Sequence, residues 1–200
     1  MVQEKRILDK ELRQELSKQS CYAIMDYLMV HFNDESKDFH YNYYFDTKDH
    51  ALSKRNITLR LRSIIKDKAM SYKLTLKIPT IDEDTYLEYN QKLDEKAFRL
   101  LAYNHKLPEG EIAELTSIHG GDVTLANMIK VNRVFALYNT QKIFFDRISH
   151  KGKTYYEVGT RIDQSKPNKD ESKMKRFIEL LKRFNITYEQ AQRRSVKYND

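Results

Sequence analysis

Short segments in which apolar and polar residues alternate recur along the chain, and they restrict it to folds built from antiparallel strands. Residues 58–63, 71–77 and 86–93 share this period of two and are separated by segments that contain the polar runs 66–68 and 82–84, which is typical of consecutive strands in one sheet. A second group of such segments follows residue 130. The predicted strands are residues 42–47, 58–63, 71–77, 86–93, 131–136, 141–148 and 154–162.

Apolar residues at helical spacing predict three further regions. The first begins at Asp9, a candidate N-cap, and continues as one or two amphipathic helices to about Phe32. Residues 95–114 and 169–184 show the same periodicity. Helices combined with an antiparallel sheet place the chain in the α+β class.

Length and composition narrow the classes of protein. With 200 residues, 40% of them hydrophobic, the chain is long enough to bury a core as one domain over residues 1–200. A lone cysteine, Cys21, excludes an internal disulfide, and no apolar stretch resembles a signal sequence or a membrane span. We therefore expect a cytoplasmic protein with no membrane partner. The net charge of +7 favours a polyanionic partner, although charge alone does not separate nucleic acid, lipid headgroups and small phosphates.

Two arginines on one predicted strand carry the first functional signal. Arg60 and Arg62 must point to the same face, roughly 7 Å apart, and Leu59 and Leu61 to the other. On an open sheet such a pair is usually a solvated face. In a closed barrel the polar face can instead line the interior. Guanidinium groups placed there would suit the oxygens of a phosphate chain.

The neighbouring predicted strands carry charges that would join this pair inside a barrel. Lys73 and Lys77 share one face of residues 71–77, and Glu88 lies on the following strand. Arg133 lies on residues 131–136, the first strand of the second group. Each strand would thus contribute one or two charges to a common interior. The pattern alone leaves the solvated face and the charged interior both open.

Several motifs, taken in order, resemble the CYTH domain, the triphosphate tunnel family. They are Asn42-Tyr-Tyr-Phe-Asp-Thr47, Leu59-Arg-Leu-Arg62, Leu74-Thr-Leu-Lys77, Leu87-Glu88, Arg133, Phe145-Asp146-Arg147 and Tyr155-Tyr-Glu-Val158. The resemblance implies an eight-stranded antiparallel β-barrel with helices packed around it, whose basic interior grips a triphosphate. It further implies Mg²⁺ or Mn²⁺ held by carboxylates, and hydrolysis of the triphosphate.

The resemblance also implies roles for individual residues. The phosphate-binding residues would be Arg60, Arg62, Lys77, Arg133, Arg194 and Lys197. Lys5 and Glu88 would take part in catalysis. The metal contacts would be Asp146, Glu157 and Glu4.

Two departures from the family pattern bear on the chemistry. The N-terminal Glu-x-Glu-x-Lys signature is not intact when it is aligned from a helix beginning at Asp9. The two possible registers place on it either Met1, Gln3 and Lys5, or Val2, Glu4 and Arg6. The later acidic strand also has fewer carboxylates than the family pattern, because its alternate positions are Glu157, Gly159 and Arg161. One hard cation needs only one or two carboxylates besides its substrate, whereas a two-metal site needs more.

Three functions of different class follow from these observations. The first is a metal-dependent triphosphatase. The second is a family member that binds a nucleotide or inorganic polyphosphate without turnover, since a basic interior could balance the roughly four charges of a triphosphate without a metal. The third is a nucleic-acid-binding module. The expected partner is a small-molecule triphosphate, nucleotide or polyphosphate, the expected assembly is a monomer or homodimer, and the identity of the triphosphate is left open.

Overall fold

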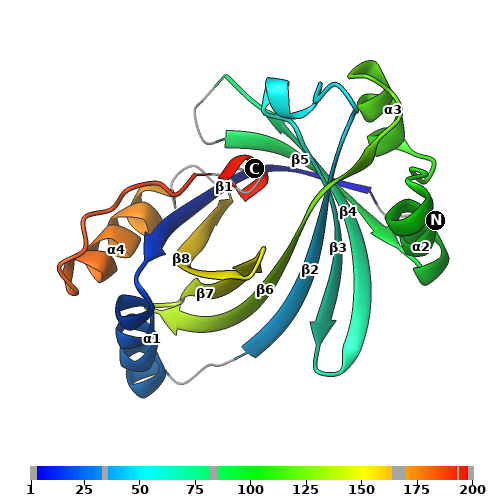
Figure 1. The fold of residues 1–200 in the computed structure, drawn as a ribbon. Helices are drawn as coiled ribbons and strands as arrows, with labels where there is room; N and C mark the ends of the chain where they lie inside the picture. The colour runs from blue at the N-terminus through cyan, green and yellow to red at the C-terminus, as the bar shows by residue number, and fades with distance from the viewer. Residues whose placement is uncertain (1–3, 33–35, 82–84, 164–169, 193, 198–200) are drawn as a thin grey trace.

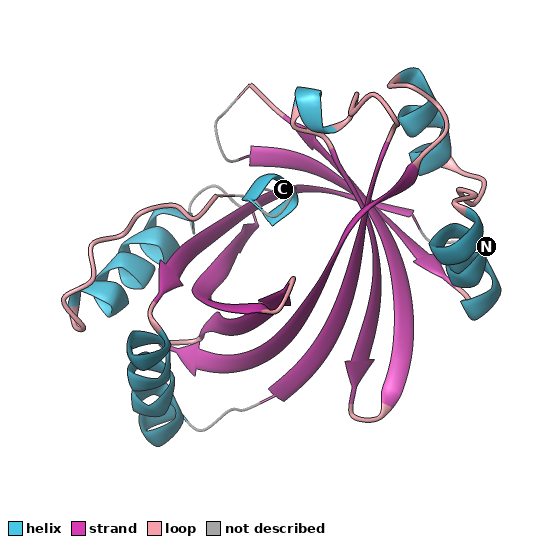
Figure 2. Ribbon diagram, viewed as in Figure 1, coloured by secondary structure: helices cyan, strands magenta, loops and turns pink. Residues whose placement is uncertain are grey.

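Eight antiparallel strands close into a barrel in the computed structural model, which describes residues 4–32, 36–81, 85–163, 170–192 and 194–197 (Figures 1 and 2). The α+β class and the eight-stranded barrel predicted from the sequence are confirmed. In chain order the strands are β1 (Glu4–Leu16), β2 (Ser36–Asp46), β3 (Thr58–Lys66), β4 (Ala69–Pro79), β5 (Thr85–Leu93), β6 (Thr124–Tyr138), β7 (Gln141–His150) and β8 (Lys153–Asp163). Around the barrel they follow the order β1-β5-β4-β3-β2-β6-β7-β8.

Four helices lie outside this barrel (Figure 2): α1 (Lys18–Phe32), α2 (Glu95–Asn104), α3 (Glu111–Ile118) and α4 (Asp170–Lys182). The 3₁₀ turn η1 (Ser53–Arg55) follows β2, and the short α5 (Arg194–Lys197) brings Arg194 to the lumen. In Figure 1, α1 and α4 lie on one side of the barrel, and α2 and α3 lie on the other. Among the described helices, none is both long and apolar enough to cross a membrane.

The N-terminal region corrects the sequence prediction. The expected helix from Asp9 is wrong over its first part, because residues 9–16 belong to β1, which pairs with β5 on one side and β8 on the other. The helix begins at Lys18 instead, and the Ser17 hydroxyl caps it by accepting a hydrogen bond from the Ser20 backbone amide at 3.0 Å. Polar residues face inward in this barrel, so β1 lacks the apolar inner face by which strands are usually recognised.

The apolar face of the sheet is turned outward, where two helix pairs bury it. Near α1 and α4 the core includes Leu12, Phe145 and Phe177, and near α2 and α3 it includes Leu59 and Leu101. All five side chains are buried. Because apolar residues occupy the outer face of these strands, the alternating polar residues line the interior. The core thus forms a shell around a polar lumen.

Candidate functional site

The inner face of β3 presents two buried arginines to the lumen. Arg60 and Arg62 are 9% and 5% exposed. Arg62 Nε donates a hydrogen bond to Asn42 Oδ1 of β2 at 2.6 Å. Arg60 differs, because its buried Nε and Nη2 atoms have no hydrogen-bond partner among the described residues. Leaving a buried polar group unpaired costs free energy, so the described residues do not satisfy the buried Arg60 guanidinium.

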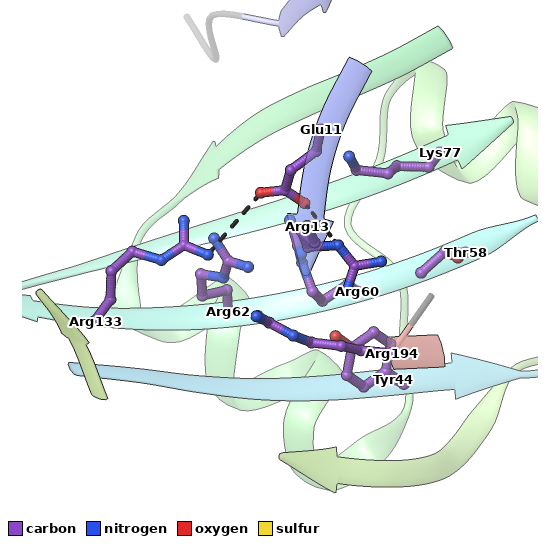
Figure 3. Close-up of a pocket in the computed structure, with 9 residues that line it drawn as sticks. All are labelled: Glu11, Arg13, Tyr44, Thr58, Arg60, Arg62, Lys77, Arg133 and Arg194. Carbon is purple, nitrogen blue, oxygen red and sulfur yellow. Dashed lines mark ion pairs between the residues drawn. The ribbon is translucent and has the colours of Figure 1, made fainter. Parts of the chain in front are cut away.

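These arginines belong to a pocket in the lumen, which Figure 3 shows with its side chains gathered around one space. Five strands and α5 contribute to it. We call it the lumen pocket, and it is lined by Glu11, Arg13, Tyr44, Thr58, Arg60, Arg62, Lys77, Arg133 and Arg194. Six of these nine residues are cations and one is a carboxylate. The described side chains leave a cavity of only about 50 Å³ here.

Burial and neighbouring like charges lower the pKa of Arg62 on β3 and of Lys73 on β4. Burial lowers the pKa of Arg62 well below its ordinary value, and the positive charges of Arg60 and Arg133 lower it further. Burial and Arg60 likewise lower the pKa of Lys73 to about 7, against the opposing effect of Glu88. A bound anion would stabilise the charged form of each of these groups.

The opposite wall of the lumen pairs its arginines with buried carboxylates. Arg133 donates to both oxygens of Asp146 at 2.7 and 2.6 Å, and Arg194 contacts Asp146 and donates from Nε to Glu157 at 3.1 Å. Arg13 Nη1 donates to the same carboxylate at 3.3 Å. We call these five residues the arginine–carboxylate cluster. Both carboxylate side chains in it are fully buried.

Ion pairing determines the protonation of this cluster. Burial acts to raise the pKa of Asp146, but Arg133 and Arg194 lower it by more, so the pKa lies below the ordinary value and the carboxyl stays ionised. Burial conversely acts to lower the pKa of Arg194, and Glu157 and Asp146 raise it by more. Fully buried ion pairs of this kind are costly to break, so the cluster holds this wall in one arrangement.

The CYTH domain model matches residues 11–195 of the chain. The chain belongs to the CYTH family.

Solved structures share the CYTH barrel at low sequence identity. A candidate adenylate cyclase from Bacillus halodurans has a TM-score of 0.80 and 22% identity, covering 98% of this chain and 99% of that one. A candidate adenylyl cyclase from Hippeastrum, described as having a dominant triphosphatase activity, has a TM-score of 0.68 and 19% identity over 94% and 91% of the two chains. A protein from Pyrococcus horikoshii OT3 has a TM-score of 0.62 and 17% identity over 95% and 96%. No protein of curated function matches the sequence significantly.

The CYTH signature has a clear counterpart on β1 that the sequence analysis missed. Glu11 and Arg13 line the lumen pocket, and Asp9 precedes them on the strand at the same spacing of two. Asp-x-Glu-x-Arg preserves the order acid, acid, base of Glu-x-Glu-x-Lys. The two earlier registers assumed a helix beginning at Asp9, and that assumption is wrong. The alternation of charges along this segment was the signal that could have located it.

Two of the predicted site residues lie at the start of this CYTH strand. Glu4 is paired with Gln91 of β5, and Lys5 is paired with Asn90. Their side chains are outside the described part of the structure, as is that of Asp9. The metal contact predicted for Glu4 and the catalytic role predicted for Lys5 therefore remain predictions.

Among the described residues, Glu11 is the carboxylate that lines this CYTH pocket. Its oxygens lie 3.7 Å from Arg13 Nε, 3.9 Å from Arg133 Nη2 and 3.6 Å from Arg161 Nε. Burial acts to raise the pKa of Glu11, and the surrounding cations, Arg161 first, lower it well below the ordinary value. Glu11 is therefore ionised at neutral pH.

Glu88 and Lys197 lie outside the centre of the CYTH pocket. The buried Glu88 carboxylate lies 2.8 Å from Lys77 Nζ and 3.8 Å from Lys73 Nζ. Burial raises its pKa, but Lys77 and the nearby arginines lower it by more, to below the ordinary range. Lys197 contacts Glu15 and lies 5.0 Å from the centre of the Tyr155 ring. It is not among the residues that line the lumen pocket.

The described carboxylates do not fit the Mg²⁺ or Mn²⁺ that the CYTH resemblance implies. Both oxygens of Asp146 are bound to arginines, and Glu157 Oε2 is as well, although buried Glu157 Oε1 has no partner in the described chain. A Cβ atom at Gly159 would lie 2.4 Å from the Phe144 ring, so that ring occupies the space where a further carboxylate would project. Within the described ranges, no three His, Cys, Asp or Glu residues are grouped to hold a metal.

Proposed function

We propose that this CYTH protein binds a triphosphate in its lumen pocket. The observation that carries the proposal is Arg60, whose buried Nε and Nη2 atoms lack a partner among the described residues while facing a pocket with five other cations. A buried unpaired charge is unfavourable, and a phosphate chain would supply acceptors to it. The fold shared with the Hippeastrum protein and its described triphosphatase activity supports the same class of ligand.

Charge and geometry both suit a short polyphosphate. A triphosphate carries roughly four negative charges near neutral pH, since its terminal group has a pKa near 6. Arg60, Arg62 and Lys77 come from adjacent strands, and Arg133 faces them from β6. Guanidinium groups bind phosphate oxygens in pairs. A cavity of about 50 Å³ is small for such a ligand, so binding requires long side chains outside the arginine–carboxylate cluster to move outward.

Hydrolysis is a second candidate function, and Glu11 favours it. This carboxylate lies in the lumen pocket beside Arg13 and Arg133, where it could orient a water molecule towards a bound phosphorus. Its lowered pKa makes it a weak proton acceptor, so its contribution would be to position the water. Because the described carboxylates do not form a metal site, no step of this proposal runs through a metal.

Calorimetry with tripolyphosphate, in Mg²⁺ and in EDTA, tests binding. We expect the wild type to bind, the Arg60→Ala/Arg62→Ala variant to lose binding, and Arg147→Ala to bind as the wild type does, because Arg147 lies on an exposed part of β7. Failure of the wild type to bind under both conditions would overturn the proposal. It would mean that the β3 arginines have a structural role only.

Phosphate release measured in the same samples tests hydrolysis separately. We expect release by the wild type and a loss of release in Glu11→Gln with tripolyphosphate still bound. Binding without any release, with or without Mg²⁺ or Mn²⁺, would identify a receptor and reject the second candidate. Release that requires the metal would show that the described carboxylates rearrange to hold it.

A further inference from the structure

Arg161 of β8 is paired with Glu11 of β1 across the two strands. Its Nε atom lies 3.6 Å from a Glu11 oxygen, and of the cations that lower the pKa of Glu11 it has the largest effect. The Arg161 side chain is 42% exposed and lines a cavity of about 530 Å³, which shares Arg62 and Arg133 with the lumen pocket. Arg161 is therefore a partner of a lumen carboxylate and is also open to a ligand next to the lumen arginines.

Cations already contact the lumen carboxylates that a metal ion would need. A Lys or Arg nitrogen lies within 3.6 Å of each of four such groups in the described structure, namely Glu11, Glu88, Asp146 and Glu157. Mg²⁺ requires oxygen ligands in near-octahedral geometry, so it would have to displace these cations. It would also meet the repulsion of the lumen pocket, which has six cations and one carboxylate.

One carboxylate oxygen in the arginine–carboxylate cluster lacks such a contact. Glu157 Oε1 is buried and has no hydrogen-bond partner among the described residues. The other oxygen, Oε2, accepts hydrogen bonds from Arg13 and Arg194 at 3.3 and 3.1 Å, so a divalent ion at Oε1 would lie beside two guanidinium groups. A single oxygen in that position does not offset their repulsion.

A guanidinium group can supply what a metal ion supplies in a phosphate site. A bound cation of either kind neutralises phosphate charge and orients the phosphate oxygens, and Arg does so through paired hydrogen bonds. Arg161 suits this role better than the cluster arginines, because its side chain is exposed whereas theirs are buried against Asp146 and Glu157. It can turn towards a ligand while the cluster keeps its arrangement.

We propose that the Arg161 guanidinium takes the place of a divalent metal ion, so that the protein binds the metal-free triphosphate and Mg²⁺ competes with the protein for it. The proposal rests on the proposed function, because it requires a triphosphate in the lumen pocket. A triphosphate complexed with Mg²⁺ carries less negative charge, so it is the poorer ligand for a pocket with six cations. The ligand is therefore the free polyphosphate anion and not its metal complex.

Calorimetry with tripolyphosphate over a series of Mg²⁺ concentrations, starting from EDTA and at constant ionic strength, tests this competition. We expect the apparent Kd to be lowest in EDTA. It should rise at least about tenfold once Mg²⁺ complexes most of the tripolyphosphate, which is the effect of losing one charge-assisted hydrogen bond. An apparent Kd that stays constant or falls as Mg²⁺ is added would overturn the proposal.

Arg161→Glu should reverse the dependence on Mg²⁺. The substitution removes the cation and places a second carboxylate opposite Glu11, and two carboxylates with a phosphate chain suit a divalent ion. We expect the variant to bind tripolyphosphate at least about tenfold more weakly than the wild type in EDTA, and to bind it more tightly in Mg²⁺ than in EDTA.

The matched control is Arg147→Glu, which makes the same change of charge on an exposed part of β7 and away from both cavities. It should keep the wild-type dependence on Mg²⁺. If Arg161→Glu behaves like this control, the role proposed for Arg161 is wrong.

Arg161→Gln is the second variant, in case charge reversal prevents folding. It removes the positive charge without adding a carboxylate, so we expect weaker binding of tripolyphosphate in EDTA than in the wild type. Binding in EDTA as tight as that of the wild type would contradict the proposal.

Two kinds of failure are distinguishable in these experiments. Tighter binding of tripolyphosphate by the wild type in Mg²⁺ than in EDTA would reject the proposal for Arg161 and leave the proposed function intact. Failure of the wild type to bind tripolyphosphate under every condition is a different outcome, since it would reject the proposed function itself.

Discussion

The arginines on the two walls of the lumen differ in their hydrogen-bond partners. On β3, Arg60 has two nitrogens without a partner in the described structure, and Arg62 donates from Nε to an uncharged amide. Across the lumen, Arg133 and Arg194 are bound to the buried carboxylate of Asp146. Both walls carry buried guanidinium groups, but only one supplies the compensating charge.

This difference separates a binding surface from a supporting one. A buried charge whose partner is present stabilises the arrangement around it, and removing the partner is strongly destabilising. A buried charge whose partner is absent destabilises the free protein and provides affinity for a ligand of opposite sign. Identical residue types on the two walls should therefore respond differently to the same substitution.

Asp146→Ala, in the arginine–carboxylate cluster, should have the largest effect on stability. It leaves Arg133 buried without the carboxylate that accepts its two hydrogen bonds, and leaves Arg194 with Glu157 alone, so we expect the free energy of unfolding to fall by about 3–5 kcal/mol. Urea unfolding measures the change. The exposed Asp122→Ala is the control and should stay within about 0.5 kcal/mol of the wild type. A loss below about 1 kcal/mol for Asp146→Ala would mean that the cluster does not support the fold.

Arg60→Met tests the β3 wall of the lumen, where we expect the arginine to contribute to anion affinity and not to stability. Charged hydrogen bonds contribute about 1.5–3 kcal/mol each, so tripolyphosphate affinity should fall about 10- to 100-fold. The free energy of unfolding should not decrease, because within the described ranges no carboxylate forms a hydrogen bond with this side chain. Arg133→Met is the matched variant and should lose both affinity and stability. Equal destabilisation by the two substitutions would contradict the contrast between the walls.

Lys73 of β4, next to the β3 arginines, makes the pH dependence of anion binding a further test. It faces Arg60 and Arg62 of β3, Glu88 of β5 and Arg161 of β8, and burial with Arg60 lowers its pKa to about 7. A bound anion favours the charged amine, so binding takes up a proton above this pH.

Tripolyphosphate affinity should accordingly fall about tenfold between pH 7.0 and 8.5, a range in which the terminal phosphate, with a pKa near 6, is already ionised. Calorimetry across this range measures the change. Lys73→Met should bind more weakly and show a flat profile. A wild-type profile as flat as that of the variant would show that Lys73 does not titrate on binding.

His40 lies on β2, between β3 and β6, and we expect the smallest effect on stability from its titration. Burial, Arg62 and Arg133 lower its folded-state pKa from 6.5 to about 2. Below pH 6.5 the unfolded chain therefore takes up a proton that the folded protein does not, and stability falls as the pH falls. From pH 6.5 to 5.5 the loss should be about 1 kcal/mol. In urea titrations His40→Gln should lose this contribution while His119→Gln retains it, and equal slopes for the two variants would contradict the prediction.

Much of the barrel could be predicted from local pattern. The strands at 58–63 and 141–148 lie within β3 and β7, and the helical stretch 95–114 contains α2, its connection to α3 and the first half of α3. β1 was the exception. Its even positions include Leu12 and Leu16, whose spacing of four also fits a helix. Its odd positions from Asp9 to Glu15 are charged, and Glu11 and Arg13 among them line the polar lumen. A sequence rule that expects an apolar interior misassigns such a strand.

The candidate site was predicted in part for a similar reason. Arg60, Arg62, Lys77, Arg133 and Arg194 were named from the family resemblance, and all five line the lumen pocket. Glu11 and Arg13 were missed because the segment that carries them was interpreted as a helix. The pairing of Asp146 and Glu157 with arginines depends on contacts between residues far apart in the chain, which no local pattern encodes.

The sequence by itself determined the alternation of the strands, the excess of positive charge and the order of the motifs, because these are properties of neighbouring residues. Only the tertiary structure decided which face of the sheet is the interior and which charges meet there. Arg194 reaches Asp146 and Glu157 across 48 and 37 residues of sequence, and Arg60 is left without such a partner among the described residues. Closure of the barrel creates both situations, because it brings every polar face into one buried space where each charge must be balanced by the protein or by its ligand.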